Sequence, residues 1–374
     1  MQRNLKAYNI AVETVGPVFV GSGREISKKE YVFLDRSTVG ILNPVKLYQF
    51  MRKLHLQNDF ENYLVNDFRQ DLGQWLRQYK IDLKQIMPCV QYTLNSGDTV
   101  LQRGTKVSVM EHIKDGYGMP YIPGSTIKGM FRTILLSEDI MSNSSHYDGH
   151  KKNLENSLFQ YHGKVNRNTY LKKEVGQIET ECFRVLQREK TKPSDAVNDI
   201  LSGMIVGDSM PIELENFTLC QKIERHVDGT DKSLNILREC VQPGTTISFM
   251  LTINEQLCKF TIEDIRQAIS KFNECYNENF LSAYKGVDLL QSDNVFLGGG
   301  TGFVTKTVVY PLFAKKEGIK AAQTVFENTK VPRLHKHNKD YEMGVSPHIL
   351  KCTRYEGQVL QMGLCRLLSV TQVG

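Results

Sequence analysis

The stretch Tyr121-Ile-Pro-Gly-Ser-Thr-Ile-Lys-Gly-Met-Phe-Arg-Thr-Ile-Leu-Leu136 decides how the first half of this chain is organised. It passes from a short apolar strand end through a Pro-Gly pair into a predicted helix, whose first turn offers Ser125 and the following Thr as caps. A helix start presents free backbone N–H groups, and Lys128 and Arg132 add two charges on one face. The stretch therefore predicts a helix start that holds a phosphate group.

A nucleoside triphosphate is not the predicted ligand of this stretch. Gly124 and Gly129 have the separation of the two glycines in a Walker loop, but Met130 and Phe131 stand where Lys and then Ser or Thr are required. We therefore expect the phosphate group at this helix start to belong to a polyanion other than a nucleoside triphosphate.

A second glycine-rich segment covers residues 297–306, with glycines at 298, 299, 300 and 302 and with Thr301 among them. A segment with so many glycines is unsuited to the hydrophobic core, because each glycine loses backbone entropy on folding and buries no side chain. We therefore expect the backbone of this segment to approach a ligand closely. The dinucleotide motif fails at Phe303 and a Walker motif fails at Thr305. Lys306 closes the segment with a positive charge.

A third segment, Gly21-Ser-Gly-Arg24, follows an apolar run and also suits a close approach to an anion, with a plain turn as the alternative. Residues 330–354 hold six basic residues against two acidic ones, interleaved with histidine and tyrosine rings. Cations and flat rings together suit single-stranded nucleic acid, and a solvated basic surface is the alternative.

Composition limits the class of protein. The 374 residues exceed one typical domain, and the formal net charge of +6 arises from 47 basic and 41 acidic residues, which is a mild basic excess. The chain holds no apolar run of membrane length, so a soluble, cytoplasmic protein is expected. The eight cysteines include no Cys-x-x-Cys pair and are predicted to be reduced and buried.

The order of elements predicts an α+β fold. Strands are expected near 8–20, 31–34, 88–118 and 358–370, and the clearest strand alternates from Ile247 to Ile253. A capping box at Thr261 and Asp264 starts a helix that extends to Tyr276. A strand pair followed by an amphipathic helix thus occurs in both halves, which indicates two α+β units.

No metal site and no cofactor are predicted. His146 and His150 lie four residues apart in the polar stretch 142–199, with His162 downstream, but no periodic apolar face fixes a helix there. We interpret the segment with these histidines as a solvated loop, within an insertion that holds helices and mobile loops.

The chain resembles the RAMP superfamily of CRISPR proteins. The resemblance rests on Pro17-Val-Phe-Val-Gly-Ser-Gly23, on the Pro-Gly-Ser-x-x-Lys-Gly-x-x-Arg element from Pro123 to Arg132, on glycine loop 298–302, and on an ending with Gly344-Val-Ser-Pro-His-Ile-Leu-Lys-Cys-Thr-Arg354. Within the superfamily it is similar to the Csm subunit that caps the 3′ end of the guide RNA in type III-A effector complexes.

The resemblance implies two tandem ferredoxin-like (RRM-like) domains. These would be residues 1–200, with a helical insertion at about 44–86 and a polar insertion at about 142–199, and residues 201–374, with the glycine-rich loop. It also implies a non-catalytic subunit that binds guide RNA (crRNA), stacks on a neighbouring filament-forming RAMP subunit, and supports guide maturation and antiviral interference. The small helical subunit of the complex and cellular nucleases are further implied partners.

Carried onto this sequence, the resemblance predicts a set of RNA-binding residues from all three segments. They are Gly21, Ser22, Gly23, Arg24, Ser125, Lys128, Arg132, Gly298, Gly299, Gly300, Thr301, Gly302 and Lys306. Glycine loop 298–302 is expected to lie near the stretch from Tyr121 to Leu136.

Catalysis is the competing prediction. A metal-independent endoribonuclease acting on guide precursors would need an acid–base pair, for which His112, His335 and His348 are candidates. Many relatives carry histidine where Phe19 stands, so that position offers no general base here. Target cleavage by a loop aspartate would fall to Asp98 or Asp115, and neither lies in a recognisable motif.

Overall fold

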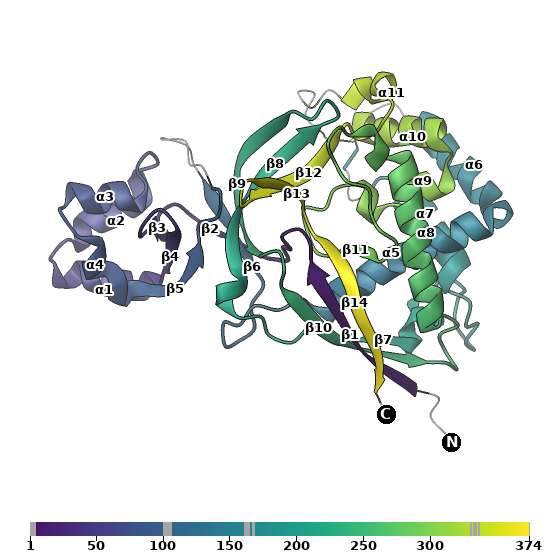
Figure 1. Ribbon diagram of the computed structural model, residues 1–374, viewed down its shortest axis with the longest axis horizontal. Coiled ribbons are helices and arrows are strands. Elements are labelled where there is room, and N and C mark those ends of the chain that lie inside the picture. The colour runs from purple at the N-terminus through teal and green to yellow at the C-terminus, as the bar shows by residue number, and fades with distance from the viewer. Residues whose placement is uncertain are drawn as a thin grey trace.

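The computed structural model describes residues 5–99, 107–160, 165–166, 169–329, 331, 335 and 337–373. Two sheets form the centre of the molecule, most helices cover one side of it, and a small lobe with α1–α4 and β3–β5 projects from the other side (Figure 1). The two ends of the chain lie side by side (Figure 1).

The first sheet has five antiparallel strands in the order β11-β14-β1-β10-β7. Alternation explains its central strand, since Tyr8, Ile10 and Val12 of β1 are buried while their neighbours are more exposed. Its strands are β1 (Leu5–Thr14), β7 (Met204–Val206), β10 (Thr246–Asn254), β11 (Asn294–Phe296) and β14 (Leu364–Val373). The first strand therefore pairs with the last one.

The second sheet follows the order β2-β6-β9-β8-β5-β4-β3, and β12 and β13 extend it from β8. It combines both halves of the chain, because β6 pairs in parallel with β9 and β5 with β8. Its strands are β2 (Gly21–Ile26), β3 (Tyr31–Phe33), β4 (Thr38–Leu42), β5 (Val90–Asn95), β6 (Ser108–His112), β8 (Phe217–His226), β9 (Asp231–Val241), β12 (Ile349–Tyr355) and β13 (Gln358–Gln361).

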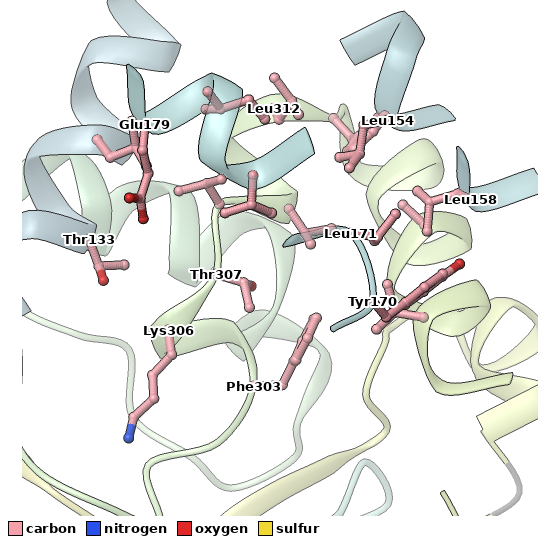
Figure 2. A pocket seen from close by; sticks show the side chains of 18 of the residues that line it. Thr133, Leu154, Leu158, Tyr170, Leu171, Glu179, Phe303, Lys306, Thr307 and Leu312 are labelled. Carbon is pink, nitrogen blue, oxygen red and sulfur yellow. The ribbon is translucent and has the colours of Figure 1, made fainter. Parts of the chain in front are cut away.

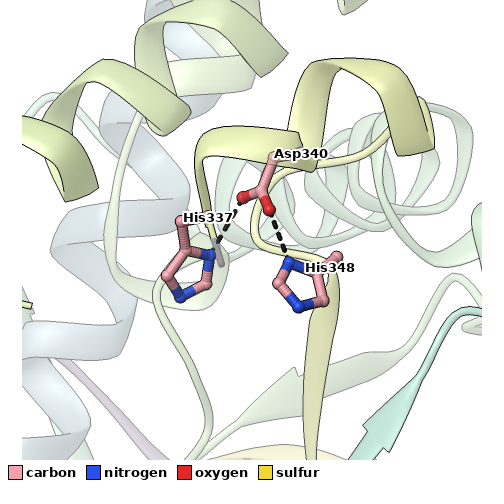
Figure 3. A group of neighbouring side chains, drawn as sticks. All are labelled: His337, Asp340 and His348. Atoms are coloured by element: carbon pink, nitrogen blue, oxygen red, sulfur yellow. Dashed lines mark hydrogen bonds and ion pairs between the residues drawn. The ribbon is translucent and has the colours of Figure 1, made fainter. Parts of the chain in front are cut away.

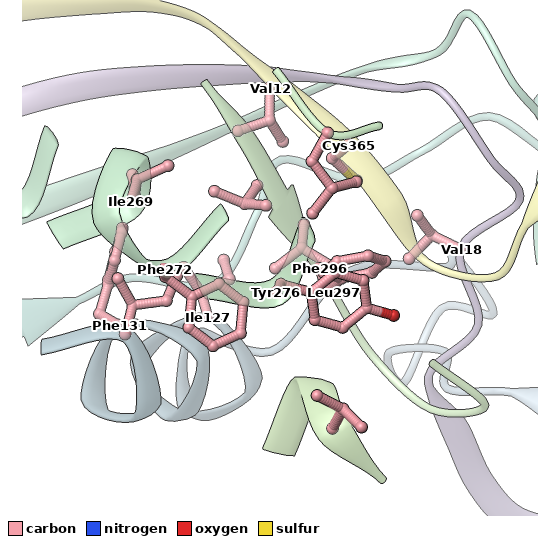
Figure 4. Packing of buried hydrophobic residues seen from close by; sticks show 14 of the residues in the cluster. Val12, Val18, Ile127, Phe131, Ile269, Phe272, Tyr276, Phe296, Leu297 and Cys365 are labelled. Carbon is pink, nitrogen blue, oxygen red and sulfur yellow. The ribbon is translucent and has the colours of Figure 1, made fainter. Parts of the chain in front are cut away.

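Helices α5 (Gly124–Ser142) and α8 (Ile262–Asn279) pack against each other beside the first sheet. Ile127 and Phe131 of α5 meet Ile269 and Phe272 of α8 in the main core (Figure 4). The other helices are α1 (Pro44–Lys53), α2 (Gln57–Asn66), α3 (Leu72–Gln78), α4 (Leu83–Ile86), α6 (Ser144–Gln160), α7 (Lys172–Phe183), α9 (Val309–Leu312), α10 (Lys315–Asn328) and α11 (Asp340–Met343).

The small lobe has its own apolar core around Trp75. Its ring stacks on Tyr63 with a centroid distance of 5.4 Å, and Phe60 and Leu76 are buried beside it. The apolar stripes of this segment are thus packing faces, as their helical spacing predicts.

Several expectations are confirmed by these elements. The mixed α/β class, the alternating strand ending at Ile253 and the capping box of Thr261 and Asp264 all appear, and all eight cysteines are free and buried. In the part of the chain that the structure describes, no helix is long and apolar enough to cross a bilayer.

Two local expectations are wrong. His146 and His150 lie in α6 and not in a loop, because Tyr147, Leu154 and Leu158 form a sparse apolar face that packs into the core. His162 lies outside the described residues. Ser125 does not cap α5, since the helix begins one residue earlier at Gly124 and its N-cap is Pro123.

Candidate nucleic-acid interface

The loop with the four glycines (the glycine loop, residues 298–302) lies against Phe19, directly before the first glycine motif. The Gly299 N–H donates to the Phe19 carbonyl oxygen at 2.6 Å. A Cβ on Gly298 would lie 2.2 Å from that oxygen, and Gly298 has φ +77°. Only glycine fits this position, so two motifs that are far apart in sequence meet here for a steric reason.

The first glycine motif forms the start of β2, an exposed edge strand with an irregular register against β6. Ser22 Oγ donates to Glu111 at 3.0 Å, and Arg24 pairs with Glu30 at 2.8 Å and with Glu111 at 3.5 Å. The charge of Arg24 is therefore balanced locally. Gly23, with φ +89°, has open space on its Cβ side, which leaves the backbone accessible.

Beyond Gly300 the loop borders a cleft with a volume of about 440 Å³, which we call the basic cleft. A Cβ on Gly300 would lie 3.0 Å from the Arg238 guanidinium, whose carbon lies 5.4 Å from the centre of the Phe19 ring. Lys222 and Lys351 line the same cleft. Backbone and cations thus converge on one concave surface.

The basic cleft keeps a positive excess. Glu224 is the one carboxylate among its described lining residues, and it pairs with Lys351 at 2.7 Å and with Lys222 at 3.5 Å. Burial is the largest effect on the pKa of Glu224 and raises it, but the hydrogen bond from Lys351 and the charges of Lys351 and Lys222 together outweigh burial, so the pKa is lowered. Burial and the nearby Lys351 lower the pKa of Lys222. Among the described residues Arg238 has no carboxylate partner, so its charge is available to an anion.

Thr301 borders the basic cleft, although its side chain is largely buried. It is 4% exposed, and its hydroxyl accepts a hydrogen bond from Thr305 at 2.8 Å. A Cβ on Gly363 would lie 2.3 Å from the Thr301 methyl group. Thr301 therefore fixes the glycine loop to the residues beneath it, through Thr305 and the close approach of Gly363.

The start of α5 already holds an anion from the chain itself. The Gly124 N–H donates to the Asp208 carboxylate at 2.7 Å, and a Cβ on Gly124 would lie 2.3 Å from the Val206 carbonyl oxygen. The glycine thus lets the helix pack closely on β7. Ser125 is exposed beside this contact.

Lys128 and Arg132 are bonded to internal partners. Lys128 Nζ donates to the carbonyl oxygens of Leu201 and Met204 at 2.7 and 2.8 Å. Arg132 pairs with Asp199 at 2.7 Å and with Glu179 at 3.0 Å. Burial lowers the pKa of Lys128. The structure gives both cations a role in joining α5 to residues 179–204, and their contact with RNA stays a prediction.

The residues that follow the glycine loop lie near α5, while the expected proximity of residues 298–302 themselves to this helix stays a prediction. Phe303, Lys306 and Thr307 share an apolar cavity of about 260 Å³ with Arg132 and Thr133 of α5 (Figure 2). The ammonium of Lys306 points away from the apolar side chains (Figure 2), and burial of its stem lowers its pKa.

The candidates for catalysis have structural partners. Both ring nitrogens of buried His112 are engaged: Nδ1 accepts from the Val20 N–H at 3.3 Å, and Nε2 lies 3.2 Å from the Tyr121 carbonyl oxygen. Burial lowers the pKa of His112 to about 4. Asp98 accepts from the Gly357 N–H at 2.6 Å, and Asp115 accepts two backbone N–H groups of its own turn. These groups hold the fold together.

The remaining two histidine candidates differ in their position relative to the basic cleft. His335 lines it, while His348 is 4% exposed and its Nδ1 lies 2.5 Å from Asp340. Of the basic tail, Lys330, Arg333 and Lys336 lie outside the described residues, and Lys351 belongs to the cleft.

Sequence reasoning missed Arg238 and Lys222 as cleft residues. They lie on neighbouring strands, β9 and β8, where Arg238 is paired with Cys220. Nothing local in the sequence marks them, because their position depends on the long-range pairing of these strands with β6 and β12.

Comparison with known proteins agrees with this geometry. The RAMP superfamily matches residues 11–305. The Csm5 protein of Mycobacterium tuberculosis H37Rv is 27% identical over 98% of both chains, and that of Streptococcus thermophilus is 24% identical over 94% of this chain and 99% of its own.

Solved structures share the fold. One chain of a cryo-EM structure of a Csm-crRNA-target RNA ternary complex superposes with a TM-score of 0.63 and 15% identity, covering 96% of this chain and all of its own. The crystal structure of T. onnurineus Csm5 gives a TM-score of 0.58 with 14% identity over the same shares. With its two glycine motifs joined at Phe19 and with 295 of its residues spanned by the family match, this chain belongs to the RAMP superfamily.

Proposed function

We propose that this chain is a non-catalytic, RNA-binding subunit of a type III-A Csm effector complex that caps the 3′ end of the guide RNA. In this role it supports guide maturation and antiviral interference in the cytoplasm. The observation that carries the proposal is the convergence of glycine loop 298–302 with Arg238 and Lys351 on one cleft. The similarity to Csm5 proteins over nearly the whole chain supports the particular complex.

The chemistry of the cleft suits an RNA backbone. Phosphates need cations and accessible backbone N–H groups, and the glycine loop brings the backbone to the surface beside Arg238. Of the predicted RNA-contacting residues, Gly21, Gly23, Gly300, Gly302 and Lys306 are those that we place at the RNA. Lys128, Arg132 and Thr301 would act by holding these elements in position.

Partners follow from the same proposal. A guide RNA is the first, and a neighbouring filament-forming RAMP subunit is the second, since an end cap must stack on the filament. The part of edge strand β2 beyond Gly23 is the surface that we assign to this neighbour, because no strand among the described residues pairs with its outer backbone groups. The small helical subunit and cellular nucleases are further partners.

The test is guide binding as a function of salt concentration. In the purified chain, the double variant Arg238→Gln with Lys351→Gln should lower the slope of log affinity against log salt by about 1.4, which is two phosphate contacts at about 0.7 each for a single strand. A matched control is Lys152→Gln with Lys316→Gln, which removes two exposed lysines on α6 and α10. Equal slopes in both double variants would contradict the proposal.

The capping role has its own test. Complexes reconstituted with and without this chain are treated with a 3′ exonuclease, and the guide ends are sequenced. Ends that are protected at one position only when the chain is present support the proposal. Incubating the chain alone with labelled precursor RNA in EDTA checks the competing nuclease function, and cleavage there would contradict a non-catalytic role.

For the architecture, we infer that β14-β1-β10-β7 with α5 and α8 forms one ferredoxin-like unit. One helix crossover leads from β1 through α5 to β7 and another from β10 through α8 to β14, which gives an antiparallel sheet in the strand order that this fold requires. The second unit would be built on β2, β6, β8, β9 and β12, so the proposed division into residues 1–200 and 201–374 would apply to the chain and not to the sheets, which both halves share.

A further inference from the structure

We propose that His337, Asp340 and His348 form a binding site for one transition-metal ion, and that Zn²⁺ is the ion that fits it best. This inference is independent of the proposed RNA-binding function. It concerns a cluster that reaches the basic cleft through His337. The sequence motifs do not indicate this cluster, because its spacing matches none of the common zinc patterns.

The three side chains converge on one point. The Asp340 carboxylate lies between two imidazoles, with Oδ2 at 3.0 Å from His337 Nδ1 and Oδ1 at 2.5 Å from His348 Nδ1 (Figure 3). One ligand atom from each residue lies within 4.8 Å of the others. The Ser346 hydroxyl donates to Asp340 Oδ2 at 2.6 Å and orients the carboxylate.

Burial makes this cluster costly without a cation. Asp340 is fully buried, His348 is 4% exposed, and no lysine or arginine pairs with Asp340 within the described part of the chain. A buried carboxylate needs a compensating positive charge as well as hydrogen bonds. A divalent cation would supply that charge.

The donor set selects the kind of ion. Two imidazole nitrogens and one carboxylate oxygen suit Zn²⁺, whereas Mg²⁺ and Ca²⁺ prefer oxygen ligands alone. Three protein ligands leave a fourth position of a tetrahedral ion open. Ligand atoms around such an ion lie roughly 3.3 Å apart, given Zn–N and Zn–O distances of about 2.0–2.2 Å, so the His348 ring would move back by somewhat under 1 Å.

Access and further ligands come from the surroundings. His337 lines the basic cleft, which gives the ion an entry path. The ring centres of His335 and His337 lie 6.0 Å apart, and those of His226 and His348 lie 5.8 Å apart. Either outer imidazole, or a water molecule, would fill the fourth position. An open position on the cleft wall would also let the ion bind a phosphate oxygen there.

The competing interpretation is a purely structural carboxylate, held by two imidazole N–H groups and the Ser346 hydroxyl. The two interpretations differ in a measurable way, because the ligand atoms of a metal site must lose their protons and the structural cluster must keep them. Stoichiometric metal binding therefore separates them.

The experiment uses the full chain, freed of metal by EDTA and dialysed. Calorimetric titration with ZnCl₂ and elemental analysis should give one bound Zn²⁺ with a dissociation constant tighter than about 1 µM. His337→Gln and Asp340→Asn should each weaken binding at least tenfold. The matched control is His146→Gln with His150→Gln, which removes two histidines of α6 and should leave binding unchanged.

Two results would overturn the proposal. The first is that the wild-type chain takes up no stoichiometric Zn²⁺ at a free Zn²⁺ concentration 100-fold above the expected dissociation constant. The second is that the control variant loses Zn²⁺ binding while the cluster variants keep it. Circular dichroism checks that the variants fold. If they do not, Co²⁺ added to the wild type decides, since a tetrahedral site with nitrogen ligands gives strong visible absorption. A weak octahedral spectrum would then contradict the site.

Discussion

Replacing Lys128 by methionine tests whether the central helix is anchored inside the molecule or presented to RNA. The change keeps most of the side-chain stem and removes the ammonium, which donates to the carbonyl oxygens of Leu201 and Met204 at 2.7 and 2.8 Å. Both carbonyls belong to buried residues. Lys128 itself is half-buried, so the loss occurs where water replaces the ammonium poorly.

The magnitude follows from the two hydrogen bonds. A hydrogen bond from a charged donor contributes about 1.5–3 kcal/mol, which sets an upper range of about 3–6 kcal/mol for two. The Leu201 carbonyl also accepts from the Met204 N–H, so it keeps one partner, and the cost of burying the ammonium disappears with it. We therefore expect a loss of about 2 kcal/mol in the free energy of unfolding.

The assay is urea unfolding followed by circular dichroism, together with guide RNA affinity measured well below the unfolding midpoint. Lys152→Met, an exposed position on α6, is the control and should change stability by less than about 0.5 kcal/mol. Guide affinity per folded molecule should be unchanged in both variants. Unchanged stability together with a more than tenfold loss of affinity in Lys128→Met would refute the internal anchor and restore Lys128 as an RNA contact.

Three further predictions concern the packing around the site. Gly298→Ala should destabilise the chain by more than about 2 kcal/mol, because its Cβ meets the Phe19 carbonyl at 2.2 Å and its φ is positive, whereas Gly129→Ala, with open space, should be neutral or stabilising by urea unfolding. Stability should fall as pH drops from about 6.5 toward 4, by at most about 1.4 kcal/mol per pH unit, because buried His112 has its pKa lowered to about 4 and the unfolded chain takes up the proton first. In His112→Asn this part of the pH dependence should vanish, and an identical slope in both proteins would contradict the assignment. All eight cysteines should resist Ellman's reagent until the chain unfolds, and rapid reaction of a thiol in the native state would show that its burial is wrong.

The sequence predicted elements whose cause is local. The alternating residues of β10, the capping box at Thr261 and the apolar stripes of the small lobe are set by neighbours within a few residues, and all three appear as expected. The loop predicted for the segment with His146 and His150 is wrong for the same reason. Its apolar residues in α6 are too sparse to mark a helix, and that helix is fixed by packing against the rest of the core.

The residues of the candidate site also divide into those that the sequence predicts and those that only the tertiary structure reveals. That glycine loop 298–302 needs a close backbone approach could be inferred from composition, yet the nearest contact of Gly298 is the chain's own Phe19 carbonyl. The same holds for the cations of α5. From the sequence, Lys128 and Arg132 are predicted to be free charges on a helix face. In the structure, Lys128 binds two carbonyl oxygens and Arg132 pairs with Asp199 and Glu179. A charge pattern does not reveal whether its counter-charge comes from a ligand or from a distant part of the chain.

By itself, the sequence determined the α+β class, the glycine motifs and the family, because these depend on residue type and short spacing. Only the tertiary structure decided that Arg238, Lys222 and Lys351 form the basic cleft and that Asp340 and His348 meet His337, which lines the cleft. These groups come from β8, β9, β12 and the segment that leads into β12, which join only when β8 pairs with β9 and with β12, a strand far away in the sequence. Such long-range pairing depends on the free energy of the whole core and leaves no local trace in the sequence.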